Sequence, residues 1–143
     1  MTNIYDELGG EIGVRSLVDR FYDQMDTLDA AKVIRAMHPA SLDGSRDRLF
    51  WFLSGWLGGP PLFMQKRGHP RLRARHLPFA VDAAARDAWM LCMRAALTEA
   101  TLSSETREKL DAALFQLADH MQNQGGNKHL PLVGGTGEPT DQG

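Results

Sequence analysis

Cysteine is nearly absent from the sequence, since Cys92 is the only one among 143 residues. The chain therefore forms no internal disulfide and does not require an oxidising compartment. Long apolar runs are also absent, and none approaches the roughly 20 residues that span a bilayer. The first residues lack the basic start and apolar stretch of a secretory signal. We expect a soluble, cytoplasmic protein that makes no contact with a membrane.

An excess of positive charge is lacking as well. The 16 Lys and Arg residues face 18 Asp and Glu residues, which gives a net charge of −2. No overall positive field is available to attract nucleic acid or an anionic membrane. Apolar residues make up 43% of the chain and charged residues 24%, a balance that suits one packed core and argues against disorder over most of the length. The length is that of a single domain.

Strand patterns are missing: no segment alternates with period two, and no internal repeat occurs. Apolar residues instead recur at helical spacing, which predicts an all-α fold. The expected helices are a short one carrying Ile4, Tyr5 and Leu8, one over 11–25, a shorter segment around Val33, Ile34 and Met37, and one over about 43–57. Two more follow: one after an N-cap at Asp82 that carries an apolar stripe to Leu97, and a last one that begins after Ser103.

For two of these helices the sequence predicts which residues form the apolar face. For the helix over 43–57 the expected face is Leu49, Phe52, Leu53, Trp56 and Leu57. For the last helix it is Leu110, Ala113, Leu114, Leu117 and Met121, with Gly125 and Gly126 ending the helix. The residues that follow are rich in Gly, Pro and Thr and have little to bury. We therefore expect a domain over 1–124 and a disordered tail over 125–143.

Residues 58–79 interrupt the helical pattern with prolines and glycines that leave room only for short helical turns. Loops of this length inside a compact domain are usually functional. This loop contains His69 and His76 among arginines, but no zinc or calcium motif is present. A metal held by one protein ligand needs a macrocycle to supply the other four, which is the arrangement in haem. The helical pattern by itself is compatible with a bundle, a helix-turn-helix protein or a globin.

Several separate segments carry a resemblance to a known family. They are Gly-Gly-Pro-Pro at 58–61, Gly-His-Pro-Arg-Leu-Arg at 68–73, Arg-His-Leu-Pro-Phe at 75–79, Phe-Tyr at 21–22, and Arg-Asp-Ala-Trp-Met-Leu-Cys-Met at 86–93. In this order and spacing the sequence resembles the group II (O-type) truncated haemoglobins of bacteria and plants, over roughly residues 3–122. The resemblance implies a truncated globin, an all-α two-on-two helical sandwich around haem b and its iron.

The resemblance also implies roles for particular residues. His76 falls at the position of the proximal histidine, which binds the haem iron. Tyr22 and Trp89 match the distal tyrosine and tryptophan, which donate hydrogen bonds to the ligand. His38 falls at a variable distal position, where it would either add a third interaction or accept the proton of Tyr22. The other implied haem contacts are Ser45 and Leu49 on the distal side, Phe63, and Arg48 as first choice for the propionates, with Arg73 and Arg75 behind it.

The function that the resemblance implies is reversible binding of dioxygen and of other diatomic ligands such as CO and NO. An alternative is a haem enzyme with peroxidase-like or nitric-oxide dioxygenase activity. Because the chain has no flavin or nicotinamide domain, that alternative needs an external reductase. A third class is a helical regulator that binds DNA through the arginine-rich loop, which the negative net charge and the broken helical pattern disfavour. The sequence does not identify the physiological ligand.

Overall fold

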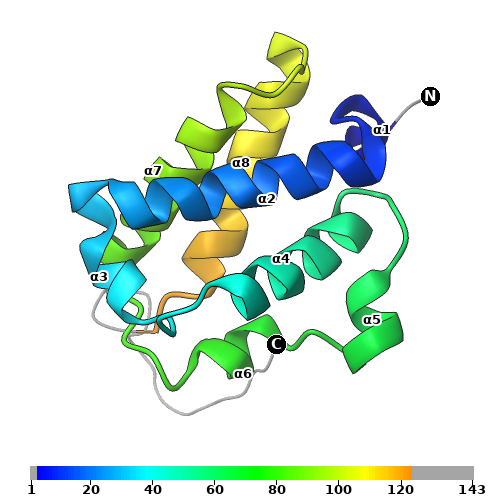
Figure 1. The fold of residues 1–143 in the computed structure, drawn as a ribbon. Helices are drawn as coiled ribbons and strands as arrows, with labels where there is room; N and C mark the ends of the chain where they lie inside the picture. The colour runs from blue at the N-terminus through cyan, green and yellow to red at the C-terminus, as the bar shows by residue number, and fades with distance from the viewer. Residues whose placement is uncertain (1–2, 124–143) are drawn as a thin grey trace, which may run out of the picture.

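The computed structural model describes residues 3–123, and within this range every regular element is a helix (Figure 1). The all-α prediction is therefore confirmed. None of these helices is long and apolar enough to cross a membrane. The elements are α1 (Ile4–Glu7), α2 (Gly10–Thr27), the short 3₁₀ helix η1 (Asp29–Ala31), α3 (Lys32–Ala36), α4 (Asp43–Trp56), α5 (Leu62–Arg67), α6 (Leu72–His76), α7 (Ala83–Leu97) and α8 (Ser104–His120).

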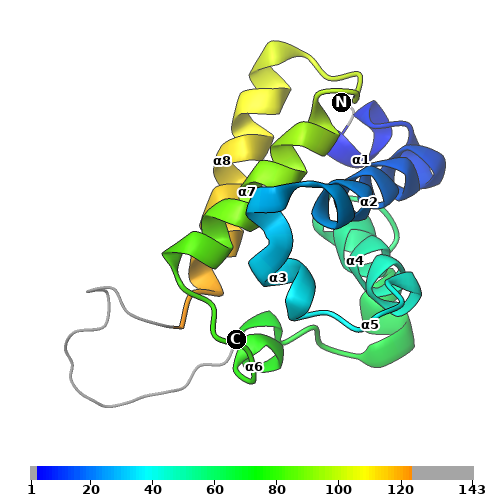
Figure 2. The same ribbon diagram turned by 60° about the vertical axis from the view of Figure 1, so that its left-hand side comes forward.

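Four long helices form two packed pairs. The helix α2 packs on both α4 and α7, and α7 packs on α8. Figure 2 shows α7 and α8 on one side of the molecule and α2 with α4 on the other. Their shared core includes Phe21 on α2, Met93 on α7 and Leu114 on α8, each almost completely buried. This is the predicted two-on-two arrangement.

The predicted N-cap of α7 is present, and α8 has a side-chain N-cap as well. The Asp82 carboxylate accepts a hydrogen bond from the Ala85 backbone N–H at 2.8 Å, at the start of α7. The Ser103 hydroxyl accepts from the Thr106 N–H at 3.1 Å, at the start of α8. Each such cap stabilises a helix by about 1 kcal/mol. The starts of α7 and α8 are thus fixed by local sequence.

The single cysteine lies in the core. Cys92 is fully buried on α7. Burial raises the pKa of its thiol to about 11, because the charged thiolate would lose its hydration. The thiol therefore stays protonated at neutral pH and packs as a small apolar group, as expected from its place on the apolar stripe of α7.

The region over 58–79 forms two short helices joined by extended chain, as the sequence predicted. Both views show α5 and α6 below α4, on the side away from α2 (Figures 1 and 2). The helix α6 is only five residues long, and His76 is its last residue. This loop therefore brings a histidine under the space between the two helix pairs.

Two details of the predicted apolar faces are wrong. Trp56 is 36% exposed and stacks on Phe52 at the surface, whereas Phe50 is 4% exposed and belongs to the core. The reason is that α4 turns one face to α2 and another to the space above α6. Ala113 is exposed because α8 packs mainly against α7 and buries only a narrow stripe. The expected helix end at Gly125 and Gly126 and the tail over 125–143 lie outside the described residues.

Candidate functional site

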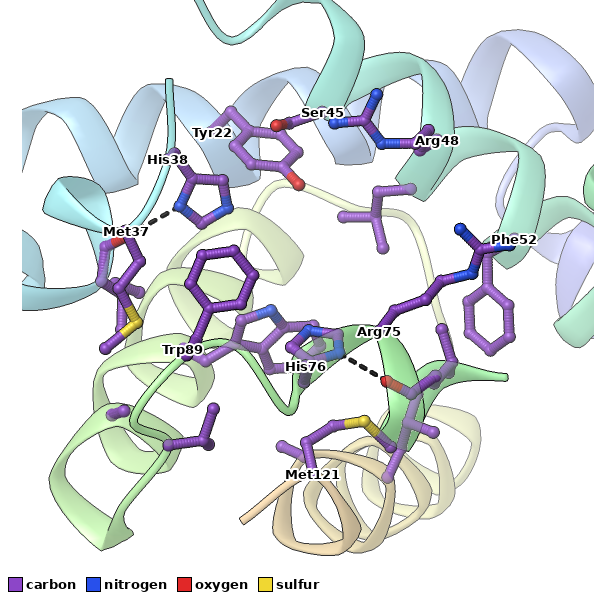
Figure 3. A pocket seen from close by; sticks show the side chains of 18 of the residues that line it. Tyr22, Met37, His38, Ser45, Arg48, Phe52, Arg75, His76, Trp89 and Met121 are labelled. Carbon is purple, nitrogen blue, oxygen red and sulfur yellow. Dashed lines mark hydrogen bonds between the residues drawn. The ribbon is translucent and has the colours of Figure 1, made fainter. Parts of the chain in front are cut away.

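A cavity of about 530 Å³ lies between the two helix pairs, and residues of α6 form part of its lining. Its volume lies in the range of pockets for small organic ligands and cofactors. Side chains from α2, α3, α4, α5, α6, α7 and α8 line it, and most of them are apolar. Figure 3 shows the cavity with its lining side chains. The polar or charged groups that line it are Tyr22, His38, Ser45, Arg48, Arg75, His76 and Trp89.

His76 is half-buried and faces the cavity from the end of α6 (Figure 3). Its ring atom Nδ1 lies 2.7 Å from the backbone carbonyl oxygen of Leu72, one turn earlier. A carbonyl only accepts hydrogen bonds, so Nδ1 carries the proton and donates it. In the neutral form of the ring, the lone pair is therefore on Nε2. A neutral histidine oriented in this way is the usual form of a metal ligand.

The residues of the cavity fit haem. Within residues 3–123 no group of three or more His, Cys, Asp or Glu side chains is placed to hold a metal ion, so a site with protein ligands alone is not present there. A single histidine with a free Nε2 in a large apolar cavity instead suits a metal whose other ligands come from a macrocycle. Two arginines, Arg48 and Arg75, lie on the side of the cavity opposite His38 (Figure 3). That placement suits a cofactor with acidic groups at one edge.

Tyr22 and Trp89 both line the cavity, and both pack against the core residue Phe21. Tyr22 is 6% exposed, and its ring packs edge-on against Phe21 with centroids 4.9 Å apart. The Phe21 ring in turn packs on Trp89 at 5.1 Å. Burial raises the pKa of Tyr22 well above its usual range, so its hydroxyl keeps its proton. The structure thus brings together a hydroxyl donor and an indole N–H donor.

An ion-pair network between α2 and α4 fixes the helix turn that carries Tyr22. Arg46 donates hydrogen bonds to Asp19 at 3.1 Å and to Asp23 at 2.9 Å. Its guanidinium lies 5.8 Å from the centroid of the Tyr22 ring. Because the two carboxylates lie on either side of Tyr22 along α2, the network holds this ring against α4.

His38 lies beside Tyr22, with ring centroids 5.9 Å apart (Figure 3). Its Nδ1 lies 2.8 Å from the carbonyl oxygen of Ile34 and therefore carries the proton. Burial lowers the pKa of His38, and the nearby positive charge of Arg35 lowers it further. The ring is therefore neutral at pH 7, and its free Nε2 only accepts hydrogen bonds. Because Nε2 carries no proton in this state, it offers no hydrogen bond to a ligand, and acceptance of the Tyr22 proton by His38 stays a prediction.

The segment that carries His38 is tied down by one arginine. Arg35 donates to the carboxylate of Asp26 at 2.6 Å and to the carbonyl oxygens of Pro39 at 2.9 Å and Ala40 at 2.8 Å. These bonds close the chain that leaves α3 into a fixed turn. The turn that places His38 in the lining of the cavity is therefore held by Arg35.

The remaining expected contacts are mostly brought together. Ser45 and Phe63 are buried, Leu49 is half-buried, and all three line the cavity. Arg75 also lines the cavity. Its Nε donates a hydrogen bond to the Pro70 carbonyl at 2.5 Å, and its guanidinium lies 5.2 Å from the centroid of the Phe63 ring. Arg73 does not line the cavity, because a shift of two positions in α6 turns its side chain to another side.

Several lining residues were not predicted as part of a site. Met37, Phe52, Leu117 and Met121 all face the cavity. In the sequence they look like ordinary core positions on apolar helix faces, so no pattern distinguishes a residue that packs on protein from one that lines a cavity. Only the arrangement of the helices separates the two.

A model of the bacterial-like globin family matches residues 3–123, which is the whole described range. Among solved structures the chain is similar to a cold-adapted truncated haemoglobin from the Antarctic marine bacterium Pseudoalteromonas haloplanktis, at 48% identity and a TM-score of 0.84. This match covers 87% of this chain and 100% of that chain.

Two further solved structures are similar. A group II 2-on-2 haemoglobin from the plant pathogen Agrobacterium tumefaciens matches at 45% identity and a TM-score of 0.84, covering 87% of this chain and 97% of that chain. A truncated oxygen-avid haemoglobin from Bacillus subtilis matches at 38% identity and a TM-score of 0.76, covering 85% of this chain and 100% of that chain. Sequence and backbone therefore point to the same group of proteins.

Proposed function

The chain belongs to the bacterial-like globins, among the group II truncated haemoglobins, and from this premise we propose that it binds dioxygen and other diatomic ligands reversibly at haem. Haem binding itself follows from membership of the globin family. The proposal adds that His76 is the protein ligand of the iron and that Tyr22 and Trp89 contact the gas. The name of the oxygen-avid protein from Bacillus subtilis supports gas binding in this group.

The observation that carries the proposal is the geometry of His76. The Nδ1 bond to the Leu72 carbonyl leaves Nε2 as the free ring nitrogen of a side chain that lines the cavity. When bound there, haem supplies an iron with one position for the histidine and one for a diatomic ligand. The hydrogen bond to Leu72 also fixes the rotation of the ring and increases its basicity, which strengthens it as a ligand.

The cavity lining also offers two hydrogen-bond donors, the Tyr22 hydroxyl and the Trp89 indole N–H. The Tyr22 hydroxyl keeps its proton, and the Trp89 indole N–H acts only as a hydrogen-bond donor. Each hydrogen bond to a polarised ligand contributes about 1 kcal/mol or more. A Tyr22 hydroxyl that is turned toward His38 Nε2 is held in place but is less available to the ligand. Tyr22 and His38 together therefore set how strongly the gas is retained.

Arg48 and Arg75 are the proposed partners of the haem propionates, because both line the cavity and neither forms an ion pair within residues 3–123. Arg73 is the less favoured partner because it lies off the cavity. No observation favours the peroxidase-like or nitric-oxide dioxygenase alternative. That alternative, the external reductase and the cytoplasmic location all stay predictions.

The test is reconstitution of the purified chain with haem, followed by absorption spectra of the oxidised form, of the reduced form, and of the reduced form under oxygen or carbon monoxide. We expect one haem per chain and a reversible spectral change with each gas. His76→Ala should lose this signature, and added imidazole should restore part of it by replacing the missing ring.

The matched control is His69→Ala, since His69 is an exposed histidine in the same segment that does not line the cavity. Its spectra should equal those of the wild type. A His76→Ala protein with unchanged spectra, or a wild type without stoichiometric haem, would contradict the proposed function.

A further inference from the structure

Asn123, the last described residue, joins the turn that follows α8 to the segment that follows α6. Its side-chain Nδ2 donates to the backbone carbonyls of His76 at 3.2 Å and Phe79 at 3.1 Å. Its Oδ1 accepts from the Val81 N–H at 2.9 Å, and its own backbone N–H donates to the Val81 carbonyl at 2.7 Å. One residue thus makes four hydrogen bonds to a six-residue stretch that starts at His76.

The orientation of the Asn123 amide follows from these partners. The Val81 N–H only donates, so the atom facing it must be the amide oxygen. The two carbonyls only accept, so they must face the amide nitrogen, which has two protons to give. The side chain therefore satisfies every partner at once, and the reversed orientation would place like groups together at all three contacts.

The helix α6 needs such support because it is short and lacks a side-chain N-cap. Five residues form too few helical hydrogen bonds to be stable alone. Its start, Arg71, is also held at a φ of 47°, in the left-handed region that favours glycine. The position of α6 therefore depends on contacts with the rest of the chain.

Most hydrogen bonds of this segment are internal to it. The His76 ring binds Leu72 and the Arg75 side chain binds Pro70, both within or next to α6. Such bonds fix the shape of the segment but cannot fix its place in the molecule. Some hydrogen bonds join residues 70–81 to residues before 70 or after 83. Within residues 3–123, all of these bonds have Asn123 as their partner.

We propose that Asn123 is a positioning residue for His76: by holding the carbonyl end of α6 against the end of α8, it sets the height and tilt of the His76 ring in the cavity. This inference rests on the proposed function, because the ring matters as an iron ligand. The ring rotation is set by Leu72 within α6, whereas the position of α6 as a body is set by Asn123.

Two substitutions separate the parts of this contact. Asn123→Ala removes all hydrogen bonds of the side chain. Asn123→Asp keeps an oxygen for the Val81 N–H but turns the donor toward His76 and Phe79 into an acceptor that faces two carbonyls. If the donors hold α6 in place, both variants should displace the His76 ring, and Asn123→Asp should do so at least as strongly.

The matched control is Asn3→Ala, at a site that does not line the cavity. Asn3 has the same kind of role at α1: its Nδ2 donates to the Gly58 carbonyl at 2.8 Å, and its Oδ1 accepts from the Asp6 N–H at 2.9 Å. This variant loses a comparable set of side-chain hydrogen bonds. It therefore reports the effect of a general loss of stability.

The experiment measures three properties of the full chain loaded with haem. They are the iron–histidine stretching frequency of the reduced protein by resonance Raman, the rate of haem loss to excess apomyoglobin, and amide hydrogen exchange at residues 77–81. Both Asn123 variants should shift the stretching frequency, speed haem loss by roughly tenfold, and exchange faster at 77–81. Asn3→Ala should leave the frequency and the exchange at 77–81 unchanged.

The outcomes are distinct. If the Asn123 variants keep the wild-type frequency and lose haem no faster than Asn3→Ala at equal thermal stability, the inference is overturned. If the wild type shows no iron–histidine band, the proposed function fails instead. Hydrogen exchange at 77–81 of the chain as purified then still decides whether Asn123 holds α6.

Discussion

Two histidines of the cavity have the same local design. His38 lies just after the short helix α3, and His76 is the last residue of the short helix α6. Each donates its Nδ1 proton to the carbonyl four residues earlier, of Ile34 and Leu72. In both, the free nitrogen is Nε2. The difference lies in their neighbours: His38 lies beside the buried ring of Tyr22, whereas His76 lies on the other side of the cavity from Tyr22. The same residue type can thus serve as a hydrogen-bond acceptor in one place and as a metal ligand in the other.

His38 should make the stability of the protein depend on pH. Its pKa in the folded chain is lowered by burial and by the nearby charges of Arg35, His76 and Arg48. Between that lowered pKa and the ordinary value of about 6.5, the unfolded chain binds a proton that the folded chain does not. The free energy of unfolding should therefore fall as the pH falls below about 6.5, and His38 should contribute no slope above it.

The measurement is denaturant unfolding of the haem-loaded protein at pH 7 and pH 5. His38→Phe removes the titrating ring but keeps an apolar ring of similar shape, so this variant should lose less stability between the two pH values than the wild type. A control variant, His69→Gln at an exposed position, should follow the wild type. Equal losses in the wild type and His38→Phe would show that His38 is not buried in its neutral form.

At the scale of elements, the small helix α1 packs against the turn that follows α4. The Tyr5 backbone N–H donates to the Leu57 carbonyl at 3.1 Å, and the ring of Tyr5 covers Gly59. A Cβ on Gly59 would lie 2.4 Å from the Tyr5 ring, which is too close for any side chain. Two glycines are therefore needed here for different reasons, since Gly58 has a φ of 106° and Gly59 lacks space.

Gly59→Ala should destabilise the protein by roughly 1–3 kcal/mol, because the added methyl group must displace the Tyr5 ring. The check is a double-mutant cycle with Tyr5→Ala, measured by denaturant unfolding. In the Tyr5→Ala background the methyl group finds free space, so the cost of Gly59→Ala should become small. Additive losses would show that the two residues do not meet.

The sequence predicts the starts of the long helices better than it predicts the position of α6. Helix starts at Asp82 and Ser103 depend on side chains within one turn, so local sequence was sufficient. The place of α6 depends on Asn123, which is 47 residues from His76 and lies in no recognisable pattern. Whether Arg73 or Arg75 faces the cavity follows from that placement. The exposed Trp56 was missed for a similar reason, because the two faces of α4 pack on different partners.

At the scale of the whole molecule, charge is segregated along the chain. Residues 48–81 contain six of the 16 basic residues and none of the 18 acidic ones. The nine ion pairs of residues 3–123 all use basic residues from outside this stretch. The negative net charge thus hides a basic surface segment, in which Lys66, Arg67 and Arg71 are exposed, Arg73 is half-buried, and Arg48 and Arg75 line the cavity.

This basic surface should speed the capture of haem, whose two propionates make it an anion. Uptake of haem by the haem-free chain, followed by stopped-flow absorption, should slow as salt rises, since ions screen charges over about 10 Å at 0.1 M. The double substitution Arg67→Glu and Arg71→Glu should slow uptake at low salt by roughly an order of magnitude. Neither residue lines the cavity, so the rate of haem loss should stay close to that of the wild type.

The control for net charge is Lys32→Glu with Lys109→Glu, which changes the total by the same amount on α3 and α8, away from the basic surface. If local field rather than total charge guides haem to the cavity, this control should slow uptake much less than the arginine pair does. The difference between the two variants should vanish at about 1 M salt, where screening reaches within about 3 Å. Equal slowing by both pairs would mean that only the net charge of the molecule matters.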